Sequence, residues 1–305
     1  MVVPQGTPLS VEGSPTAVGS PPTTSKWRAA QRLSTLVILL VLLASLGGLL
    51  IDGVYGEPAS VAEMLRGYDL TTLLLAVPGL VLCQLWARRH SDRAQLVWLG
   101  LLAYLVYIYA YYLFGTSFNA LFLLHVLVFA GSLGALLVAS LALDTHGIAT
   151  RFARRTPRRS VSAVLGLLAA ALGGLWVYWS IRTVTTGQVP PGSALVEPDV
   201  VVHLGVALDL AVLVPAYAVA AVLLWRGVAA GYLLAAALLV SSTLHQVSYM
   251  VALGFQAMAG VPGAVAFDPV EPLIAALCAV STVVLLFCAG RARTATTSDP
   301  DTRTR

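Results

Sequence analysis

The 305 residues are 58% hydrophobic and 10% charged, and their mean hydropathy is +0.85. Soluble globular domains average about 45–50% apolar and about 25% charged residues, so this composition excludes an ordinary water-soluble enzyme. The net charge of +4 does not indicate nucleic-acid binding, because the basic residues stand in short segments beside apolar runs. The composition therefore predicts an all-α polytopic membrane protein, with membrane lipids as its partners and no nucleic acid.

The chain begins with residues 1–31, which hold prolines among Ser, Thr and Gly and are predicted to form a disordered cytoplasmic tail. Residues 291–305 are similarly polar and predict a second such tail. Between them lie eight apolar runs long enough to cross about 30 Å of hydrocarbon, at 33–52, 70–87, 95–114, 120–143, 161–182, 203–225, 228–252 and 272–290. These runs predict eight transmembrane helices.

The arginines support an even number of spans. With eight helices and both termini inside, every Lys and Arg except Arg66 and Arg182 falls in a cytoplasmic segment, while the outer segments collect acids that include Asp69, Glu197 and Glu271. Positive charge near helix ends is retained on the cytoplasmic side. We therefore expect a multi-pass protein of the plasma (inner) membrane with both termini cytoplasmic.

Two of the runs share a pattern that suggests an internal repeat. The second reads DLTTLLLAVPGLVLCQLWARR from Asp69, and the sixth reads DLAVLVPAYAVAAVLLWRG from Asp209. Each contains a proline, Pro78 or Pro215, and ends with Trp and Arg. The pattern suggests two parallel four-helix halves, at 32–160 and 161–290. The alternative is that Trp and Arg mark any inner membrane interface.

Two segments carry a resemblance to a known family. YIYAYYLFGTSFNALFLLHV at 107–126, together with HLGVALDLAVLVPA at 203–216, resembles a family of uncharacterised multi-pass membrane proteins of actinobacteria and archaea. The resemblance covers most of residues 33–290. It implies a polytopic membrane fold and no particular activity or site residues.

Four polar side chains are expected at a similar depth, in the outer half of the membrane, when depth is counted at about 1.5 Å per residue from the outer end of each span. They are Tyr107, His125, Asp209 and His245. Such groups are costly in hydrocarbon and require a partner or a purpose. They are therefore the candidates for binding a substrate or a proton.

Helical spacing adds two polar stripes to this set. Residues three or four apart share a face of a helix. The seventh span shows such a series in Ser241, Ser242, His245, Ser248 and Tyr249. The third span shows one in Tyr104, Tyr107 and Tyr111. Neither stripe is suited to face lipid. We expect both to point into the bundle toward the sixth span, with Tyr107 or Tyr249 on the wall of a cavity shared by Asp209, His125 and His245.

Three functions fit these features. The first is a transporter-like or small-solute-binding protein with a polar cavity near the outer leaflet, proton-coupled through Asp209 and His245. The second is a membrane oxidoreductase that binds haem or copper through His125 and His245, although neither histidine stands in an HxxxH or CxxCH spacing and we predict no metal or cofactor. The third is a non-catalytic sensory or assembly subunit, in which the polar groups satisfy one another and fix helix packing.

Overall fold

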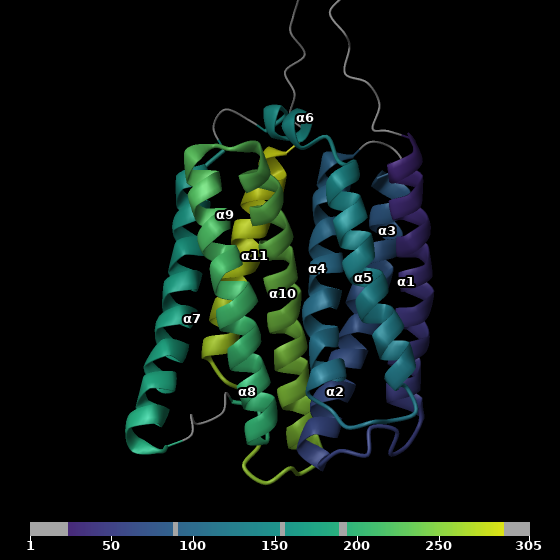
Figure 1. Cartoon of the computed structure of the whole chain (residues 1–305), viewed down its shortest axis with the longest axis vertical. Helices are drawn as coiled ribbons and strands as arrows, with labels where there is room; N and C mark the ends of the chain where they lie inside the picture. Colours follow the sequence, from purple (N-terminus) through teal and green to yellow (C-terminus); the bar gives the residue numbers. More distant parts are fainter. Residues whose placement is uncertain (1–23, 88–90, 153–155, 189–193, 290–305) are drawn as a thin grey trace, which may run out of the picture.

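The computed structural model describes residues 24–87, 91–152, 156–188 and 194–289, and within them every regular element is helical. Eight helical segments are long and apolar enough to cross a membrane, which confirms the predicted number. Figure 1 shows them as an upright bundle in which the first and last described residues lie at the same end. Of the two predicted tails, at 1–31 and 291–305, residues 1–23 and 291–305 lie outside the described residues. Residues 24–31 form the start of the first helix, so the prediction of a disordered tail is wrong for this part.

The first half of the bundle contains four of these segments. They are α1 (Thr24–Leu50), the continuous run of α2 (Ala59–Thr71), a π-helical segment (Thr72–Ala76) and α3 (Val77–Ala87), then α4 (Asp92–Phe114) and α5 (Phe122–Ala142). The second run begins at residue 59 rather than 70. The amphipathic stretch AEMLRGYDL at 62–70, which a hydropathy criterion leaves in the outer loop, is therefore part of a helix long and apolar enough to span a membrane.

The second half follows a short helix, α6 (Thr145–Thr150). It contains α7 (Arg158–Thr186), the run of α8 (Asp199–Leu208), a second π-helical segment (Asp209–Leu213) and α9 (Val214–Arg226), then α10 (Ala229–Met258) and α11 (Val270–Cys288). Each π-helical segment ends two residues before a proline, Pro78 or Pro215. Proline has no backbone N–H, so it cannot donate a hydrogen bond to the preceding turn of the helix. The wider π turn accommodates the missing bond.

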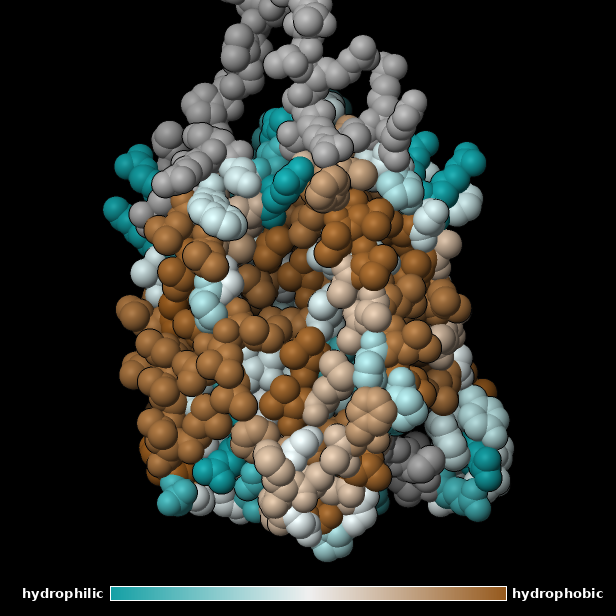
Figure 2. Space-filling model, turned by 180° about the vertical axis from the view of Figure 1, so that it is seen from behind, coloured by the Kyte–Doolittle hydropathy of each residue, from teal (hydrophilic) through white to brown (hydrophobic). Residues whose placement is uncertain are grey.

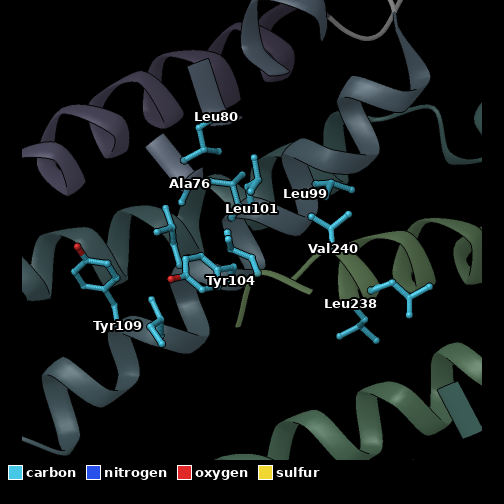
Figure 3. Packing of buried hydrophobic residues seen from close by; sticks show 14 of the residues in the cluster. Ala76, Leu80, Leu99, Leu101, Tyr104, Tyr109, Leu238 and Val240 are labelled. Carbon is cyan, nitrogen blue, oxygen red and sulfur yellow. The ribbon is translucent and has the colours of Figure 1, made fainter. Parts of the chain in front are cut away.

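The two halves meet along α4 and α10, which are buried over most of their lengths. Glycines allow the backbones to approach: a side chain at Gly100 would overlap Val240, and one at Gly67 would overlap the backbone of Ala252. Figure 3 shows α4 packed between Ala76 and Leu80 on one side and Leu238 and Val240 on the other. In a membrane, close packing of this kind replaces the hydrophobic effect as the force that holds helices together.

The surface matches a bilayer. Figure 2 shows a broad apolar belt with hydrophilic residues gathered at both ends. The end that carries Arg93, Arg151, Arg158 and Arg226 is called the basic end below, and the end that carries Glu57, Glu197 and Asp268 is called the acidic end. The first and last described residues, Thr24 and Ala289, both lie at the basic end.

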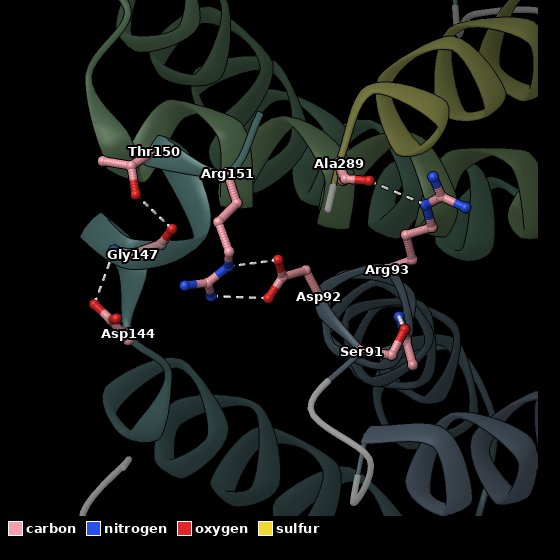
Figure 4. Close-up of polar contacts among 9 residues, drawn as sticks. Ser91, Asp92, Arg93, Asp144, Gly147, Thr150, Arg151 and Ala289 are labelled. Carbon is pink, nitrogen blue, oxygen red and sulfur yellow. Dashed lines mark hydrogen bonds and ion pairs between the residues drawn. The ribbon is translucent and has the colours of Figure 1, made fainter. Parts of the chain in front are cut away.

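Contacts at the basic end join segments that are far apart in the sequence (Figure 4). The guanidinium of Arg151 donates two hydrogen bonds to the Asp92 carboxylate, at 2.7 and 2.8 Å. Arg93 donates to the backbone carbonyl of Ala289 at 3.1 Å, which joins the start of α4 to the end of α11. The carboxylate of Asp92 raises the pKa of Arg151, so this ion pair persists across the physiological pH range.

Candidate functional site

Asp209 is held inside the second half by donors from two other helices. It is the first residue of the π-helical segment Asp209–Leu213 and is 9% exposed. Its Oδ1 accepts a hydrogen bond from the Tyr107 hydroxyl at 2.7 Å, and its Oδ2 accepts one from the Trp176 indole N–H at 2.8 Å. The ion pairs formed by the described residues lie elsewhere, at Arg66 and Arg151. The carboxylate is thus oriented on both oxygens, but no described Lys or Arg side chain forms an ion pair with it.

A cavity of about 610 Å³ lies in front of this carboxylate. It is bounded by α7, the α8–α9 run, α10 and α11, and residues of α2 and α4 close it toward the first half. It reaches from the loops at the acidic end, at Glu197 and Asp268, to the middle of the bundle, at Tyr217, Ser242 and Cys278. Its volume lies within the range of about 300–1,000 Å³ that is typical of small-molecule sites.

Four of the five predicted site residues line this cavity, namely Tyr107, Asp209, His245 and Tyr249. The edge of the Tyr107 ring meets the His245 ring with 4.9 Å between centroids, and His245 Nδ1 has no hydrogen-bond partner among the described residues. The Tyr249 hydroxyl accepts a hydrogen bond from the backbone N–H of Leu195 at 3.0 Å. The expected stripe on α10 therefore does point into the bundle, toward the α8–α9 run.

One member of that stripe turns elsewhere. The Ser248 hydroxyl lies 2.7 Å from the Tyr104 hydroxyl, which lies 3.0 Å from that of Thr72. These three groups form a hydrogen-bonded chain across the interface between the halves. Tyr104 and Ser248 are therefore packing groups of that interface and do not line the cavity.

His125 does not share the cavity, so the prediction of a single site for Asp209, His125 and His245 is wrong on this point. Its ring is fully buried among aromatic rings of the first half, with centroids 4.8 Å from Tyr112 and 5.9 Å from Tyr109. Neither ring nitrogen has a hydrogen-bond partner among the described residues. The physical reason is that α5 packs along α1, which directs His125 toward the first half.

A second buried carboxylate, Asp69, was missed by the sequence analysis, which placed it in an outer segment. It is 0% exposed; its Oδ1 accepts a hydrogen bond from Tyr112 at 3.0 Å, and Oδ2 accepts one from Tyr55. Burial and the Asp69 carboxylate raise the pKa of Tyr55 far above its ordinary value, so the hydroxyl keeps the proton it donates. The available signal was the helical spacing of AEMLRGYDL, which continues into the apolar run.

The tyrosines of α4 divide between the two carboxylates. Tyr107 and Tyr111 line the cavity of the second half, whereas Tyr109 and Tyr112 stack on each other and surround His125 in the first half. Residues 107 and 109 lie about 200° apart around a helix of 3.6 residues per turn. One helix therefore supplies the aromatic side chains of both polar clusters.

The described residues include no group of three or more His, Cys, Asp or Glu side chains arranged to hold a metal ion. His125 and His245 lie in different halves, so the two rings cannot ligate one haem or copper as the oxidoreductase hypothesis required. Fold and site together define a multi-pass α-helical membrane protein with a mostly apolar, aromatic-lined cavity that contains a buried carboxylate. Comparisons with protein-family models, with curated proteins and with solved structures give no match.

Proposed function

We propose that the protein binds a small polar solute in the cavity beside Asp209 and acts as a solute-binding or transporter-like protein of the plasma membrane. The observation that carries this proposal is the contrast between the oriented, unpaired Asp209 carboxylate and the space of about 610 Å³ in front of it. A carboxylate needed for packing alone would be sealed by its neighbours, as Asp69 is. A buried acid that faces a cavity typically marks a substrate or ion pathway.

The contacts at the basic end and the extent of the cavity support a direction for access. The Arg151–Asp92 ion pair and the Arg93–Ala289 hydrogen bond join elements at that end, whereas the cavity extends to the loops of the acidic end. The distribution of arginines supports a cytoplasmic position for the basic end. The proposed solute therefore enters from outside, and the described conformation is the one that receives it.

Orientation is tested by single cysteines in a background without Cys83, Cys278 and Cys288. Cysteines at Glu57 and Val265, in loops of the acidic end, should react with a membrane-impermeant thiol reagent added to intact cells, and a cysteine at His146 on α6 should not. Reaction at position 146 and protection at 57 and 265 would reverse the assigned direction.

Solute binding is tested on the purified protein by thermal shift and tryptophan fluorescence, because Trp176 and Trp179 both line the cavity. The probes are organic cations, organic anions, sugars and neutral amino acids. We expect one class to raise the melting temperature and change the emission, and Trp176→Phe to reduce the fluorescence response. If no class does either, and a cysteine at Val206 on the cavity wall resists small thiol reagents, the solute-binding proposal fails.

Proton coupling through Asp209 and His245 is the second part of this proposal. It is supported by their common position on the cavity wall and by Tyr107, which donates to Asp209 and contacts the His245 ring. In proteoliposomes, Asp209→Asn should abolish solute-driven proton flux while leaving exchange of solute measurable. Proton flux in that variant equal to the wild type would remove the coupling role.

A further inference from the structure

The charges of the cavity indicate what kind of solute it suits. Four carboxylates line it, those of Glu197, Asp209, Asp268 and Glu271, and no described lining residue is Lys or Arg. Glu271 accepts a hydrogen bond from Gln246, and Asp268 accepts one from the backbone N–H of Val270. A wall of this composition repels anions and attracts cations.

The deepest of these acids, Asp209, forms no ion pair with a described residue. Tyr107 and Trp176 each donate a hydrogen bond to Asp209, and such bonds favour the ionised carboxylate, whereas its burial opposes ionisation. An ionised carboxylate in a low-dielectric interior is costly unless a positive charge lies beside it. Since no side chain in the described part of the chain forms an ion pair with Asp209, the missing charge is one that a ligand can bring.

The remaining surface of the cavity is unsuited to a bare metal ion. Hard cations such as Ca²⁺ require six to eight oxygen ligands at about 2.3–2.6 Å. Asp209 instead contacts Tyr107 and Trp176, and the cavity lining also includes the Tyr217 ring and the aliphatic side chains of Leu172 and Leu213. Aromatic faces attract organic cations and are the usual recognition element for quaternary ammonium groups. Aliphatic neighbours provide contact for hydrocarbon substituents.

One aromatic residue of the cavity wall already contacts a cation, although that cation is not itself a lining residue. The guanidinium of Arg182 lies 5.1 Å from the centroid of the Trp179 ring, and it is kept there by hydrogen bonds to Tyr178 and Gln188. Trp179 lines the cavity. This contact shows that the electrostatics of the acidic end are compatible with a cation over an aromatic ring, and it leaves Asp209, deeper in the bundle, without an ion pair.

We propose that the ligand is an organic monovalent cation, a protonated amine or a quaternary ammonium compound, whose charged group lies beside Asp209 and whose hydrocarbon part contacts the aromatic and aliphatic walls. This inference rests on the proposed function and names its substrate class. Asp209 supplies the counter-charge, while Tyr107 and Trp176 orient it.

The decisive experiment compares isosteric probes on the purified wild-type protein. Choline, tetraethylammonium and benzylamine are the cations, 3,3-dimethylbutan-1-ol is the neutral isostere of choline, 3,3-dimethylbutanoate is the anion and NaCl supplies an inorganic cation. Isothermal titration calorimetry should give at least one organic cation an affinity at least about tenfold above that of the neutral and anionic probes, the size expected for one charged contact. Equal affinities for choline and its neutral isostere, tighter binding of the anion, or saturation by Na⁺ alone would overturn the assignment.

Variants locate the effect. Asp209→Asn should lower cation affinity about tenfold or more and leave binding of the neutral isostere unchanged, and Asp209→Glu should restore part of the affinity. Asp69→Asn is the matched control, since this carboxylate lies in the first half and does not line the cavity; it should not change cation affinity. An equal loss in both variants would show that the effect is global.

A second measurement does not require ligand affinity. In the cysteine-free background, Val206→Cys on the cavity wall should react faster with the cationic reagent trimethylammonioethyl methanethiosulfonate than with the anionic sulfonatoethyl reagent. Both rates are normalised to those of Phe118→Cys, because Phe118 lies in a first-half loop and is 85% exposed. Asp209→Asn should reduce this preference. If both reagents enter but the normalised ratio shows no cation preference, the cavity binds solutes of another charge, and the broader solute-binding proposal survives while the cation assignment fails.

Discussion

The two halves of the bundle contain similar components with opposite results. Each has a span with a π-helical segment before a proline, a buried carboxylate, and tyrosines from α4 that donate to that carboxylate. In the first half α1 packs along α5 and the carboxylate is sealed; in the second half α7 and α11 contact each other only over a short stretch, and a cavity fills the space between them. The first helix of each half, α1 or α7, therefore determines whether the buried carboxylate is covered by packing or faces a cavity.

The largest expected effect comes from exchanging glycines on those first helices. A side chain at Gly48 on α1 would overlap the Asp69 carboxylate and the Tyr55 hydroxyl, whereas one at Gly174 on α7 would meet no atom within 4 Å. Gly48→Ala should therefore lower the free energy of unfolding by about 2–3 kcal/mol. Gly174→Ala should be neutral or slightly stabilising, because Ala is the better helix former.

Thermal unfolding of both variants in detergent measures this difference. Equal melting temperatures would contradict the sealed packing assigned to the first half.

The next effect concerns the two carboxylates. Asp69→Ala leaves the Tyr55 hydroxyl without its acceptor in a site closed to water, which should cost about 2 kcal/mol. Asp209→Ala leaves donors that face a cavity large enough for water, so its cost should stay below about 1 kcal/mol. Denaturant or thermal unfolding ranks the two, and a larger loss for Asp209→Ala would show that its cluster is the structural one.

The third comparison is between alanine variants of the two histidines, His245 on the cavity wall and His125 in the core of the first half. His245→Ala removes the ring that packs on Tyr107 and should weaken cation binding by about 1 kcal/mol, without adding fully to the effect of Asp209→Asn, since the residues act through the shared Tyr107. His125→Ala should leave binding unchanged and lower the melting temperature. Binding of choline or tetraethylammonium together with unfolding of each variant separates the roles; fully additive effects of His245 and Asp209 would indicate independent sites.

The smallest effect lies at the basic end. Arg151→Ala removes a bidentate but partly exposed ion pair with Asp92, and such pairs contribute at most about 1 kcal/mol. His146→Ala, on the same short helix, is the control and should cause no loss. The raised pKa of Arg151 keeps the guanidinium protonated, so the ion pair stabilises the fold at every pH below the unfolded pKa of this group. Its contribution to the free energy of unfolding should therefore be constant from about pH 6 to 8. A loss of stability within that interval would assign the contribution to another group.

The number of spans and the direction of the polar stripe on α10 could be predicted because hydropathy and helical spacing are local properties. The start of the second span could not be predicted in that way. Arg66 and Asp69 interrupt its first turns, and no local average reveals that Tyr55 and Tyr112 would satisfy the carboxylate. The burial of Asp69 is a tertiary result that a hydropathy average assigns to a loop.

His125 illustrates the same limit for the site. Its depth in the membrane is similar to that of His245, and depth was the property that grouped them. The side of the bundle that His125 faces depends on the packing of α5 against α1. These two helices are about ninety residues apart in the sequence, as Val37 and Val128 in the shared core illustrate. Trp176 was missed for a related reason, because a tryptophan within an apolar run is indistinguishable by sequence from one that faces lipid.

The Asp-Leu pairs that suggested a repeat also do not correspond when the π-helical segments are aligned. Asp209 begins its π-helical segment, whereas Asp69 lies three residues before Thr72, the first residue of the other. Thr72 is thus the counterpart of Asp209, and each lies within hydrogen-bond distance of an α4 tyrosine, Tyr104 or Tyr107. A duplication of the two halves stays a prediction, to be tested by superposing residues 70–114 on 210–252.

The division of α4 tyrosines between the halves constrains how this sequence can change in length. Inserting or deleting one residue between Trp98 and Tyr104 would rotate everything beyond it by about 100°, turning Tyr107 away from Asp209 and Tyr112 away from Asp69 in a single step. No compensating change in one half could repair both. The number of residues in this part of α4 is therefore fixed by two sites at once. A substitution can be accommodated locally, but the insertion or deletion of one residue would disrupt both the buried Asp69 cluster and the Asp209 cavity.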